Sequence, residues 1–333
     1  MKHEMKQTNR MSRRTAAVFC AALAAAGGAA AQAYPNKPVR MMVGYAPGSS
    51  TDIVGRLVAS KLGEMWKQTV IVENRGGAAG NLAADVVAKS TPDGYTVLFA
   101  QNGLAISVGG NPSLPFNGEK DLIPVAAVAA TPHILIVAAT SPYKTVKELV
   151  AAVKAKPGAL SFASSGIGNS DHMAGELFNN MADLKAIHIP YRGGSLAATD
   201  TLSGQVDYYF AGMPVGLPQA KSGRARALAV TGKQRFAGAP EVPTVAEAGF
   251  PEYEAVLWQG VFLPAGTPKD VVTKIAHDVN TILDSADMKE KMTAAGVQIL
   301  RSTQPEFDAY YRADIAKWAR VIKASGIKLG SGS

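Results

Sequence analysis

Apolar residues in this chain follow two alternating patterns, which together predict repeated units of strand, loop and helix. The run Val39 to Tyr45 is almost continuously apolar, as in a buried strand, and a segment rich in Gly and Ser follows it. Beyond that segment, apolar residues recur at helical spacing and predict one buried helix face: Ile53, Leu57, Val58, Leu62 and Met65.

The same unit recurs along most of the chain. Further strands are expected over residues 69–73, 95–100, 134–139, 160–164, 187–191, 206–210 and 225–231. Most of these are separated by helical patterns or glycine-rich turns, and alternation of this kind favours parallel sheets built from βαβ units. The sequence therefore predicts an α/β fold.

The last part of the chain predicts two amphipathic helices that return to an earlier part of the fold. One starts at Thr267-Pro268, which supplies a helix cap and a proline at the first helical position, and the other starts at Thr303. We expect both helices to pack on the first of two lobes, so that the chain crosses between the lobes twice, near residues 130–135 and 254–260. The predicted divisions are residues 34–133 for the first part of lobe 1, 134–256 for lobe 2 and 257–333 for the return to lobe 1.

Residues 1–33 have the composition of an export signal. Five basic residues precede an apolar stretch from Thr15 to Ala31, and Ala31-Gln32-Ala33 is a small-residue cleavage motif. We expect cleavage after Ala33 and a periplasmic product. Arg13 and Arg14 leave the general secretory route and the twin-arginine route both open.

The composition of the remaining 300 residues excludes several functions. They carry 29 basic and 25 acidic residues, without the basic runs and interleaved aromatics of a nucleic-acid-binding protein. They contain no cysteine, because Cys20 lies in the leader, and no two histidines stand at the close spacing of a zinc pair. We therefore expect no metal and no cofactor. We also expect the protein to be a monomer.

Two Gly/Ser loops are the candidate ligand site. Loop 1 spans residues 47–52 and loop 2 spans residues 164–170, and each precedes a predicted helix. A helix start exposes unpaired N–H groups and a partial positive charge, which stabilise an anion, while glycine and serine allow its close approach. Each loop alone is equally consistent with a tight turn. Two such loops in different lobes favour a carboxylate held from both sides.

Catalytic motifs are not supported by the spacing. The string Gly166-Ile167-Gly168 begins like a dinucleotide-binding motif but has Asp171 in place of the third glycine, and the chain has no G-x-S-x-G motif. Ser170, Asp171 and His172 are the residue types of a catalytic triad, but neighbours on one turn seldom point at one another. We therefore expect no enzymatic activity.

Residues outside the two loops complete the predicted site. Tyr45 ends the first strand, Arg192 could make a bidentate contact with a carboxylate, and Asp207 could accept a hydrogen bond, although a turn or surface role explains the last two equally well. The full set of candidate ligand-binding residues is Tyr45, Pro47, Gly48, Ser49, Ser50, Thr51, Asp52, Asn102, Ser164, Ser165, Gly166, Gly168, Asn169, Ser170, Tyr191, Arg192, Gly193, Asp207 and Phe262.

Many short motifs occur in the order found in one family of transport receptors. Among them are Tyr34-Pro35-x-Lys37-Pro38, Pro47-Gly48-x-x-x-Asp52, Asn74-Arg75-x-Gly77-x-x-Gly80-Asn81, Pro92-Asp93-Gly94-Tyr95-Thr96, Ser164-Ser165-Gly166-x-Gly168 with His172, Pro190-Tyr191-Arg192-Gly193-Gly194, Gly204-x-Val206-Asp207 and Pro264-Ala265-Gly266-Thr267-Pro268. In this order the chain resembles the Bug-type extracytoplasmic solute receptors of tripartite tricarboxylate transporters. The resemblance covers essentially the whole chain after the leader.

The resemblance implies a type II periplasmic binding protein with crossing chains. It implies a small organic acid as ligand (a di- or tricarboxylate, an acidic amino acid or an aromatic acid), with residues 45–52 and 164–170 holding one carboxylate, and delivery to a membrane permease. A sensor kinase as partner stays open as an alternative, and a secreted α/β hydrolase using Ser170 and His172 is a further rival. Ser49 and Asn169 depart from the family pattern, which usually has Gly and Ser or Thr there.

Overall fold

The computed structural model describes residues 34–325, 327 and 329, and the predicted leader, residues 1–33, lies outside them. The chain divides into Met1–Asn36 and a compact unit from Lys37 onward. Residues 34–36 carry no helix or strand, and all the elements below belong to the second unit.

Four strands and part of a fifth form sheet A. Their order is β2 (Val70–Asn74), β1 (Val39–Val43), β3 (Thr96–Gln101), β9 (Val256–Pro264) and the first part of β4 (Leu122–Ala138). The strands β2, β1 and β3 are parallel, whereas β9 runs antiparallel to both of its neighbours. The carboxyl ends of β1 and β3 therefore meet at one edge of sheet A.

Sheet B continues from the second part of β4. There β4 pairs with β8 (Ala225–Val230) on one side and with β7 (Tyr208–Gly212) on the other, both antiparallel. Parallel pairing then extends the sheet to β5 (Ser161–Ser164) and β6 (Ile187–Pro190). The single strand β4 thus belongs to both sheets.

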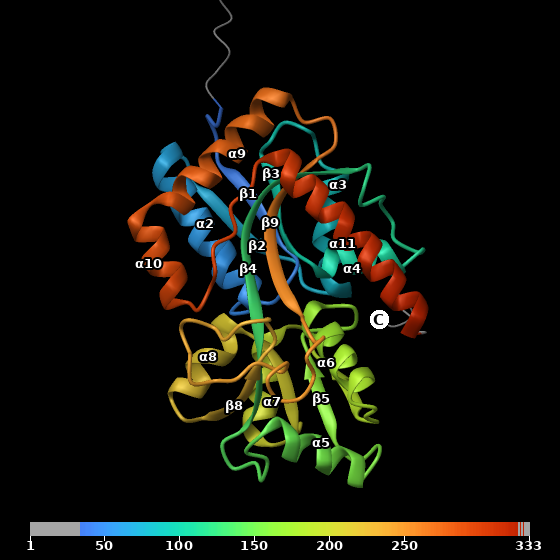
Figure 1. The fold of residues 1–333 in the computed structure, drawn as a ribbon. Coiled ribbons are helices and arrows are strands. Elements are labelled where there is room, and N and C mark those ends of the chain that lie inside the picture. Colours follow the sequence, from blue (N-terminus) through green and yellow to red (C-terminus); the bar gives the residue numbers. More distant parts are fainter. Residues whose placement is uncertain (1–33, 326, 328, 330–333) are drawn as a thin grey trace, which may run out of the picture. The chain divides into compact units, whose positions relative to one another are not determined.

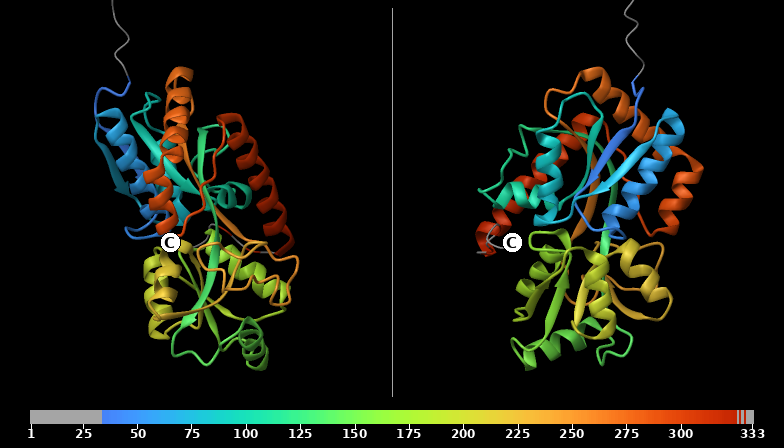
Figure 2. Two further views of the ribbon diagram at one scale, coloured as in Figure 1. Left: turned by 60° about the vertical axis from the view of Figure 1, so that its left-hand side comes forward. Right: turned by 180° about the vertical axis from the view of Figure 1, so that it is seen from behind.

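Helices cover both sheets (Figures 1 and 2). Those around sheet A are α2 (Ser50–Trp66), α3 (Asn81–Ala88), α4 (Gly103–Gly110), α9 (Lys269–Asp284), α10 (Ala286–Ala294) and α11 (Gln304–Ser325), with a short 3₁₀ turn at Ala78–Gly80. Those around sheet B are α5 (Val146–Ala155), α6 (Ser170–Met181), α7 (Gly194–Ser203) and α8 (Met213–Lys221). No helix among the described residues has the length and apolar character that crossing a membrane requires.

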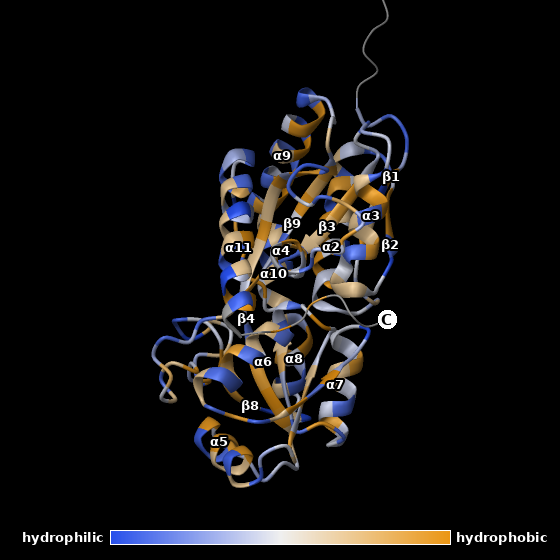
Figure 3. Cartoon of the chain, turned by 90° about the vertical axis from the view of Figure 1, so that its right-hand side faces the viewer, coloured by the Kyte–Doolittle hydropathy of each residue, from blue (hydrophilic) through white to orange (hydrophobic). Residues whose placement is uncertain are grey.

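Apolar strands form the interior of both halves, and polar residues cover the outer helix faces (Figure 3). In sheet A the core centres on aromatic rings, with Trp258 and Phe262 of β9 packed against Phe307 and Tyr311 of α11. In sheet B a comparable cluster packs Phe162 and Phe210 around helices α5 and α6. Each half therefore has a core of its own.

The chain passes between the sheets twice, as the sequence predicts. The first passage lies within β4, where residues up to Pro132 pair with β9 and residues from His133 pair with β7. The second is the entry to β9 after Ala255, whose N–H donates to the carbonyl of Thr231. Both sheets are therefore connected through β4 and through the segment that enters β9.

Several elements differ from the sequence-based expectation. The strand expected at 134–139 is the end of β4, which starts at Leu122, and β9 occupies the segment expected to be a hinge at 254–260. Helices α2 and α6 begin at Ser50 and Ser170, so the last residues of loops 1 and 2 already belong to the first helical turns. Helices α4, α8 and α10 were not expected.

Candidate functional site

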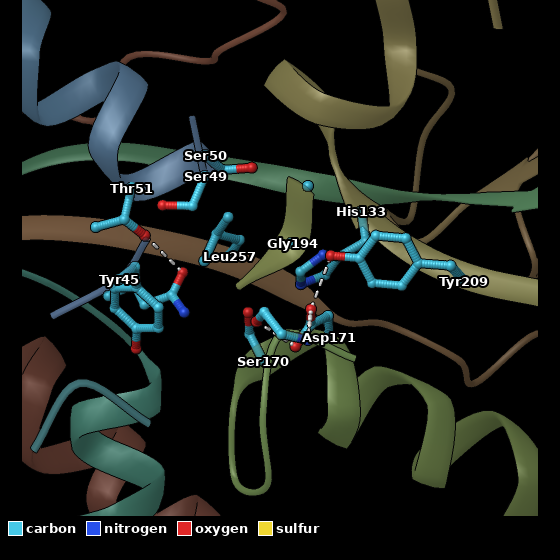
Figure 4. A pocket seen from close by; sticks show the side chains of 13 residues that line it. Tyr45, Ser49, Ser50, Thr51, His133, Ser170, Asp171, Gly194, Tyr209 and Leu257 are labelled. Atoms are coloured by element: carbon cyan, nitrogen blue, oxygen red, sulfur yellow. Dashed lines mark hydrogen bonds between the residues drawn. The ribbon is translucent and has the colours of Figure 1, made fainter. Parts of the chain in front are cut away.

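A small polar cavity lies where the starts of α2 and α6 face each other (Figure 4). Its volume is about 20 Å³, room for about one water molecule. The residues that line it come from both sheets and their helices: Tyr45, Ser49, Ser50, Thr51, Gln101, His133, Ser165, Ser170, Asp171, Gly194, Tyr209, Gly212 and Leu257.

Asp52 holds loop 1 in shape. Its Oδ2 accepts the N–H of Gly48 at 2.9 Å, and its Oδ1 accepts from the side chain of Asn74 at 2.7 Å. Arg56 contacts both oxygens at 3.0 Å. Gly48 has φ of 77°, a left-handed conformation that glycine adopts without steric cost. Ser49 caps α2, its hydroxyl accepting the N–H of Asp52 at 3.3 Å.

Asp171 holds loop 2 in shape, as Asp52 holds loop 1. Its Oδ2 accepts the N–H of Ser165 at 2.7 Å and the hydroxyl of Tyr209 at 2.9 Å. Its Oδ1 accepts the hydroxyl of Ser165 and the N–H of His172, both at 2.9 Å. Since each oxygen takes two hydrogen bonds, this carboxylate is used within the protein although it lies in the cavity wall.

The two aspartates differ in ionisation because their partners differ. Burial tends to raise the pKa of Asp52, but hydrogen bonds from Arg56, Asn74 and Gly48 outweigh it, so the pKa of Asp52 is lowered. Burial raises the pKa of Asp171, and hydrogen bonds from Ser165 and Tyr209 offset only part of that rise. Arg56 lowers the pKa of Asp52, whereas no cation contributes to the pKa of Asp171, so the two pKa values shift in opposite directions.

Direct contacts join the two halves around the cavity. The Tyr45 hydroxyl lies 2.8 Å from the carbonyl of Ala79 and 3.1 Å from Oδ1 of Asn169, which belongs to loop 2. Burial raises the pKa of Tyr45, so its hydroxyl keeps its proton for these contacts. At Gly212, a Cβ atom would lie 2.1 Å from the Ser50 hydroxyl. A side chain at position 212 would therefore force the Ser50 side chain at the start of α2 to move.

His133 is a buried member of the cavity wall. Its side chain is 1% exposed, and neither ring nitrogen has a hydrogen-bond partner. Burial lowers the pKa of His133 to about 4, and the nearby backbone of Ala211 and Phe210 offsets only part of that fall. The imidazole is therefore neutral at pH 7.

Comparison with known proteins identifies the family. Residues 54–327 match the family described as the tripartite tricarboxylate transporter family receptor. The chain belongs to this receptor family. Its members are solute-binding receptors, a class that binds ligands and is not enzymatic.

Relatives of known name agree with this family assignment. Protein BugT of Bordetella pertussis is 34% identical over 94% of this chain and 96% of its own length. Periplasmic binding protein BugD is 31% identical with a TM-score of 0.85, covering 89% of this chain and 99% of its own. An R. palustris protein solved with adipate gives the same values. MatC from Rhodopseudomonas palustris, solved with malate, is 29% identical with a TM-score of 0.83 over 87% of this chain and 100% of its own. The type II periplasmic binding protein fold with two chain crossings is thus confirmed.

In this receptor the predicted site residues separate into several groups. Six of them line the cavity: Tyr45, Ser49, Ser50, Thr51, Ser165 and Ser170. Others lie in the two loops or beside them without lining it: Pro47, Gly48, Asp52, Ser164, Gly166, Gly168, Asn169 and Gly193. A Cβ atom on Gly193 would lie 2.8 Å from that of Ala46, so Gly193 serves the contact between the halves.

The remaining five predicted residues do not line the cavity, and four of them have structural contacts elsewhere. Asn102 starts α4 and donates to the carbonyl of Val256 at 3.0 Å. Asp207 accepts from the N–H of Ser161 at 2.8 Å, and Tyr191 donates to Asp200 at 2.7 Å. Phe262 is fully buried in the core of sheet A, and the side chain of Arg192 is exposed.

Sequence reasoning missed seven residues of the cavity wall: Gln101, His133, Asp171, Gly194, Tyr209, Gly212 and Leu257. Five of these lie on strands β3, β4, β7 and β9, far apart in sequence, and only sheet topology brings them together. Only Asp171 had a signal in the sequence, because it stands in the first turn of a helix after a Gly/Ser loop, as the predicted residue Asp52 does. Each of these two aspartates accepts a backbone N–H of its own loop and so stabilises the loop's conformation.

The structure offers no catalytic pair at loop 2. Nδ1 of His172 accepts the N–H of Gly168 at 3.1 Å, and its Nε2 lies 3.4 Å from Glu176, so both ring nitrogens are engaged away from Ser170. Ser164 and His188 do form a contact of 2.6 Å, but Ser164 is fully buried. Among the described residues, no group of three or more His, Cys, Asp and Glu side chains is arranged to hold a metal ion.

Proposed function

We propose that this receptor binds a small organic carboxylate, with one carboxylate group held between the starts of α2 and α6. The observation that carries the proposal is the convergence of two helix starts, one from each half, on a single cavity that also carries the hydroxyls of Ser49, Ser50, Thr51 and Ser170. Backbone N–H groups and hydroxyls at helix starts stabilise an anion. Adipate and malate, which two structural neighbours hold, are acids of this class.

Binding requires the two halves to separate. A cavity of about 20 Å³ admits about one water molecule, which is less than any dicarboxylate occupies. We propose rotation at the β4 and β9 passages, with loss of the contact between Tyr45 and Asn169 as the cleft opens. The proposed lobes are residues 34–133 with 257–333, and residues 134–256.

We also propose the setting in which this receptor works. Cleavage after Ala33 would release a monomer into the periplasm, where it delivers its ligand to the permease subunits of a tripartite tricarboxylate-type transporter. The family description and the solved periplasmic relatives support this setting. No described feature favours a sensor kinase as partner over a permease.

Isothermal titration of the protein with adipate, malate and acetate tests the proposal. We expect at least one dicarboxylate to bind at one site, and the uncharged diamide of adipic acid not to bind. Ser170→Ala should weaken binding about tenfold, because a hydrogen bond to a charged group contributes about 1.5 kcal/mol or more. Ser222→Ala, at an exposed hydroxyl on the same half, is the matched control and should bind like the wild type. Absence of heat with every carboxylate would contradict the proposal.

A further inference from the structure

The imidazole of His133 is the least satisfied polar group of the cavity wall. It is 1% exposed and has no hydrogen-bond partner on either nitrogen. Buried polar side chains nearly always have a partner, and leaving one without costs about 1–3 kcal/mol. A group that faces a cavity takes its partner from what occupies the cavity, which is a water in the closed form or a polar group of a bound ligand.

The backbone holds the His133 ring in this position. Its N–H donates to the hydroxyl of Thr231 at 2.6 Å, and the N–H of Thr231 donates to the His133 carbonyl at 2.9 Å. Gly212 stands directly opposite His133 on β7, and directly opposed residues of antiparallel strands point to the same face. Gly212 has no side chain, so Ser50 at the start of α2 occupies that space on the same face as the imidazole.

No titratable group in the cavity satisfies His133. Besides His133 these are Tyr45 from the end of β1, Asp171 from α6 and Tyr209 from β7. Both oxygens of Asp171 are saturated by its four hydrogen bonds, and Tyr209 donates to one of them. Asp52, the acidic residue in the first turn of α2, is bound to Arg56 and Asn74. No free negative charge of these elements competes for the imidazole.

We propose that His133 is a specificity-determining residue that donates a hydrogen bond to a second acidic group of the ligand and takes up a proton as that ligand binds. The inference rests on the proposed function and names the ligand class as dicarboxylates. A carboxylate against the ring favours the charged imidazolium, which binds it more strongly than the neutral ring does.

The proton uptake has a defined sign. Burial lowers the pKa of His133 to about 4 in the free protein, and an anionic ligand raises it in the complex. The complex therefore binds more protons than the free protein between these two pKa values. Affinity for a dicarboxylate should rise as the pH falls from 8 to 6, by up to tenfold per pH unit where one whole proton is taken up.

Titration of the wild type with adipate and malate at pH 6.5, in buffers of different ionisation enthalpy, counts the protons taken up. We expect a measurable uptake of up to one proton, and none in His133→Asn or His133→Gln. Either variant should bind the dicarboxylate at least tenfold more weakly and change the affinity for acetate much less. The matched control is His277→Asn, which removes a histidine of α9 that does not line the cavity.

The outcomes separate this inference from the proposed function. If the wild type binds a dicarboxylate but shows neither proton uptake nor a ligand-dependent change in the NMR signals of the His133 ring, the inference is wrong and the proposed function stands. This wild-type measurement does not depend on the folding of a variant. If the wild type binds no carboxylate at all, both are contradicted.

Discussion

Asp171 lies in the wall of a proposed anion site, where a free negative charge would repel the ligand. Its four hydrogen bonds use that charge to fix Ser165, His172 and Tyr209 instead. Asp52 has the corresponding role in loop 1, where it binds the N–H of Gly48. Asp52 and Asp171 therefore stabilise the conformations of loops 1 and 2. The hydroxyls and N–H groups of the loops are left to contact an anion.

Asp171→Asn tests this role. The amide has one oxygen to accept and an NH₂ group that cannot, so some of the four hydrogen bonds must be lost. We expect the free energy of unfolding in urea to fall by about 1–3 kcal/mol and adipate affinity to fall more than tenfold.

Asp207→Asn is the control for this change. Asp207 holds Ser161 at the opposite end of β5 from loop 2, so its variant should lose stability while keeping affinity. If Asp171→Asn and Asp207→Asn lose the same affinity, the effect does not come from the hydrogen bonds that Asp171 makes to loop 2.

Two histidines predict how stability depends on pH. Burial lowers the pKa of His133 to about 4, and burial with the nearby His172 lowers the pKa of His188 to about 3. In the unfolded chain both titrate near 6.5, so below that pH the unfolded state takes up protons that the folded state does not.

Stability should therefore fall as the pH drops from about 6.5 towards 4. Each histidine contributes a slope of about 1.4 kcal/mol per pH unit in that window. Urea unfolding of the ligand-free protein at pH 7, 6 and 5 measures this slope, and His133→Asn should reduce it by about half. A slope unchanged in that variant would contradict the buried, neutral state of His133.

At the scale of elements, strands with a short apolar run before a Gly/Ser segment could be predicted. The first part of β4, the strand that belongs to both sheets, could not. The strand β1 is a short apolar run before a Gly/Ser segment, and its position follows from that pattern alone. The first part of β4 contains Pro124 and Pro132 among many alanines, a composition with low strand preference. Register shifts near Pro124 and Ala127 accommodate this segment within sheet A. Its neighbour β9, rather than local preference, makes it a strand.

The candidate site also has a part that local sequence predicts and a part that depends on sheet topology. Loops 1 and 2 could be predicted because glycine and serine before a helix have a direct chemical meaning. Gln101, His133, Tyr209 and Leu257 meet at the cavity only because their strands do, and nothing in their local sequences marks them. Phe262, also a predicted site residue, lies on β9 and is buried in the core of sheet A.

Gly212→Ala tests the contact between β7 and α2. The added Cβ would lie 2.1 Å from the Ser50 hydroxyl and 3.0 Å from the Ser50 Cβ, so Ser50 must change its side-chain conformation and shift slightly in the closed arrangement described above. We expect adipate affinity to fall at least tenfold while the free energy of unfolding changes little. Gly76→Ala is the matched control because the nearest atom to its Cβ is 3.5 Å away. Full affinity in Gly212→Ala would show that this contact is not part of the bound state.

At the scale of the whole molecule, the balance between open and closed forms depends on a few contacts across the cleft. Tyr45 is one of them, since its hydroxyl reaches Asn169 in the other half. A hydrogen bond contributes about 1 kcal/mol, which changes the ratio of two conformations about fivefold.

Tyr45→Phe should therefore shift the ligand-free protein towards the open form. Small-angle X-ray scattering should report a larger radius of gyration than for the wild type, and a saturating dicarboxylate should reduce the difference. Tyr310→Phe, an exposed tyrosine on α11, is the control and should scatter like the wild type. Identical scattering from all three proteins would argue against Tyr45 as a closing contact.

The path of β9 also sets the order in which the protein can be completed during synthesis. Strand β3 pairs with β9 on one side, and β9 leaves the ribosome only after every strand of sheet B has been made. Until then one edge of β3 has no neighbour, and unpaired strand edges are prone to aggregation. In a newly made chain, the free edge of β3 is thus covered only once the last quarter of the chain, which contains β9, has been made.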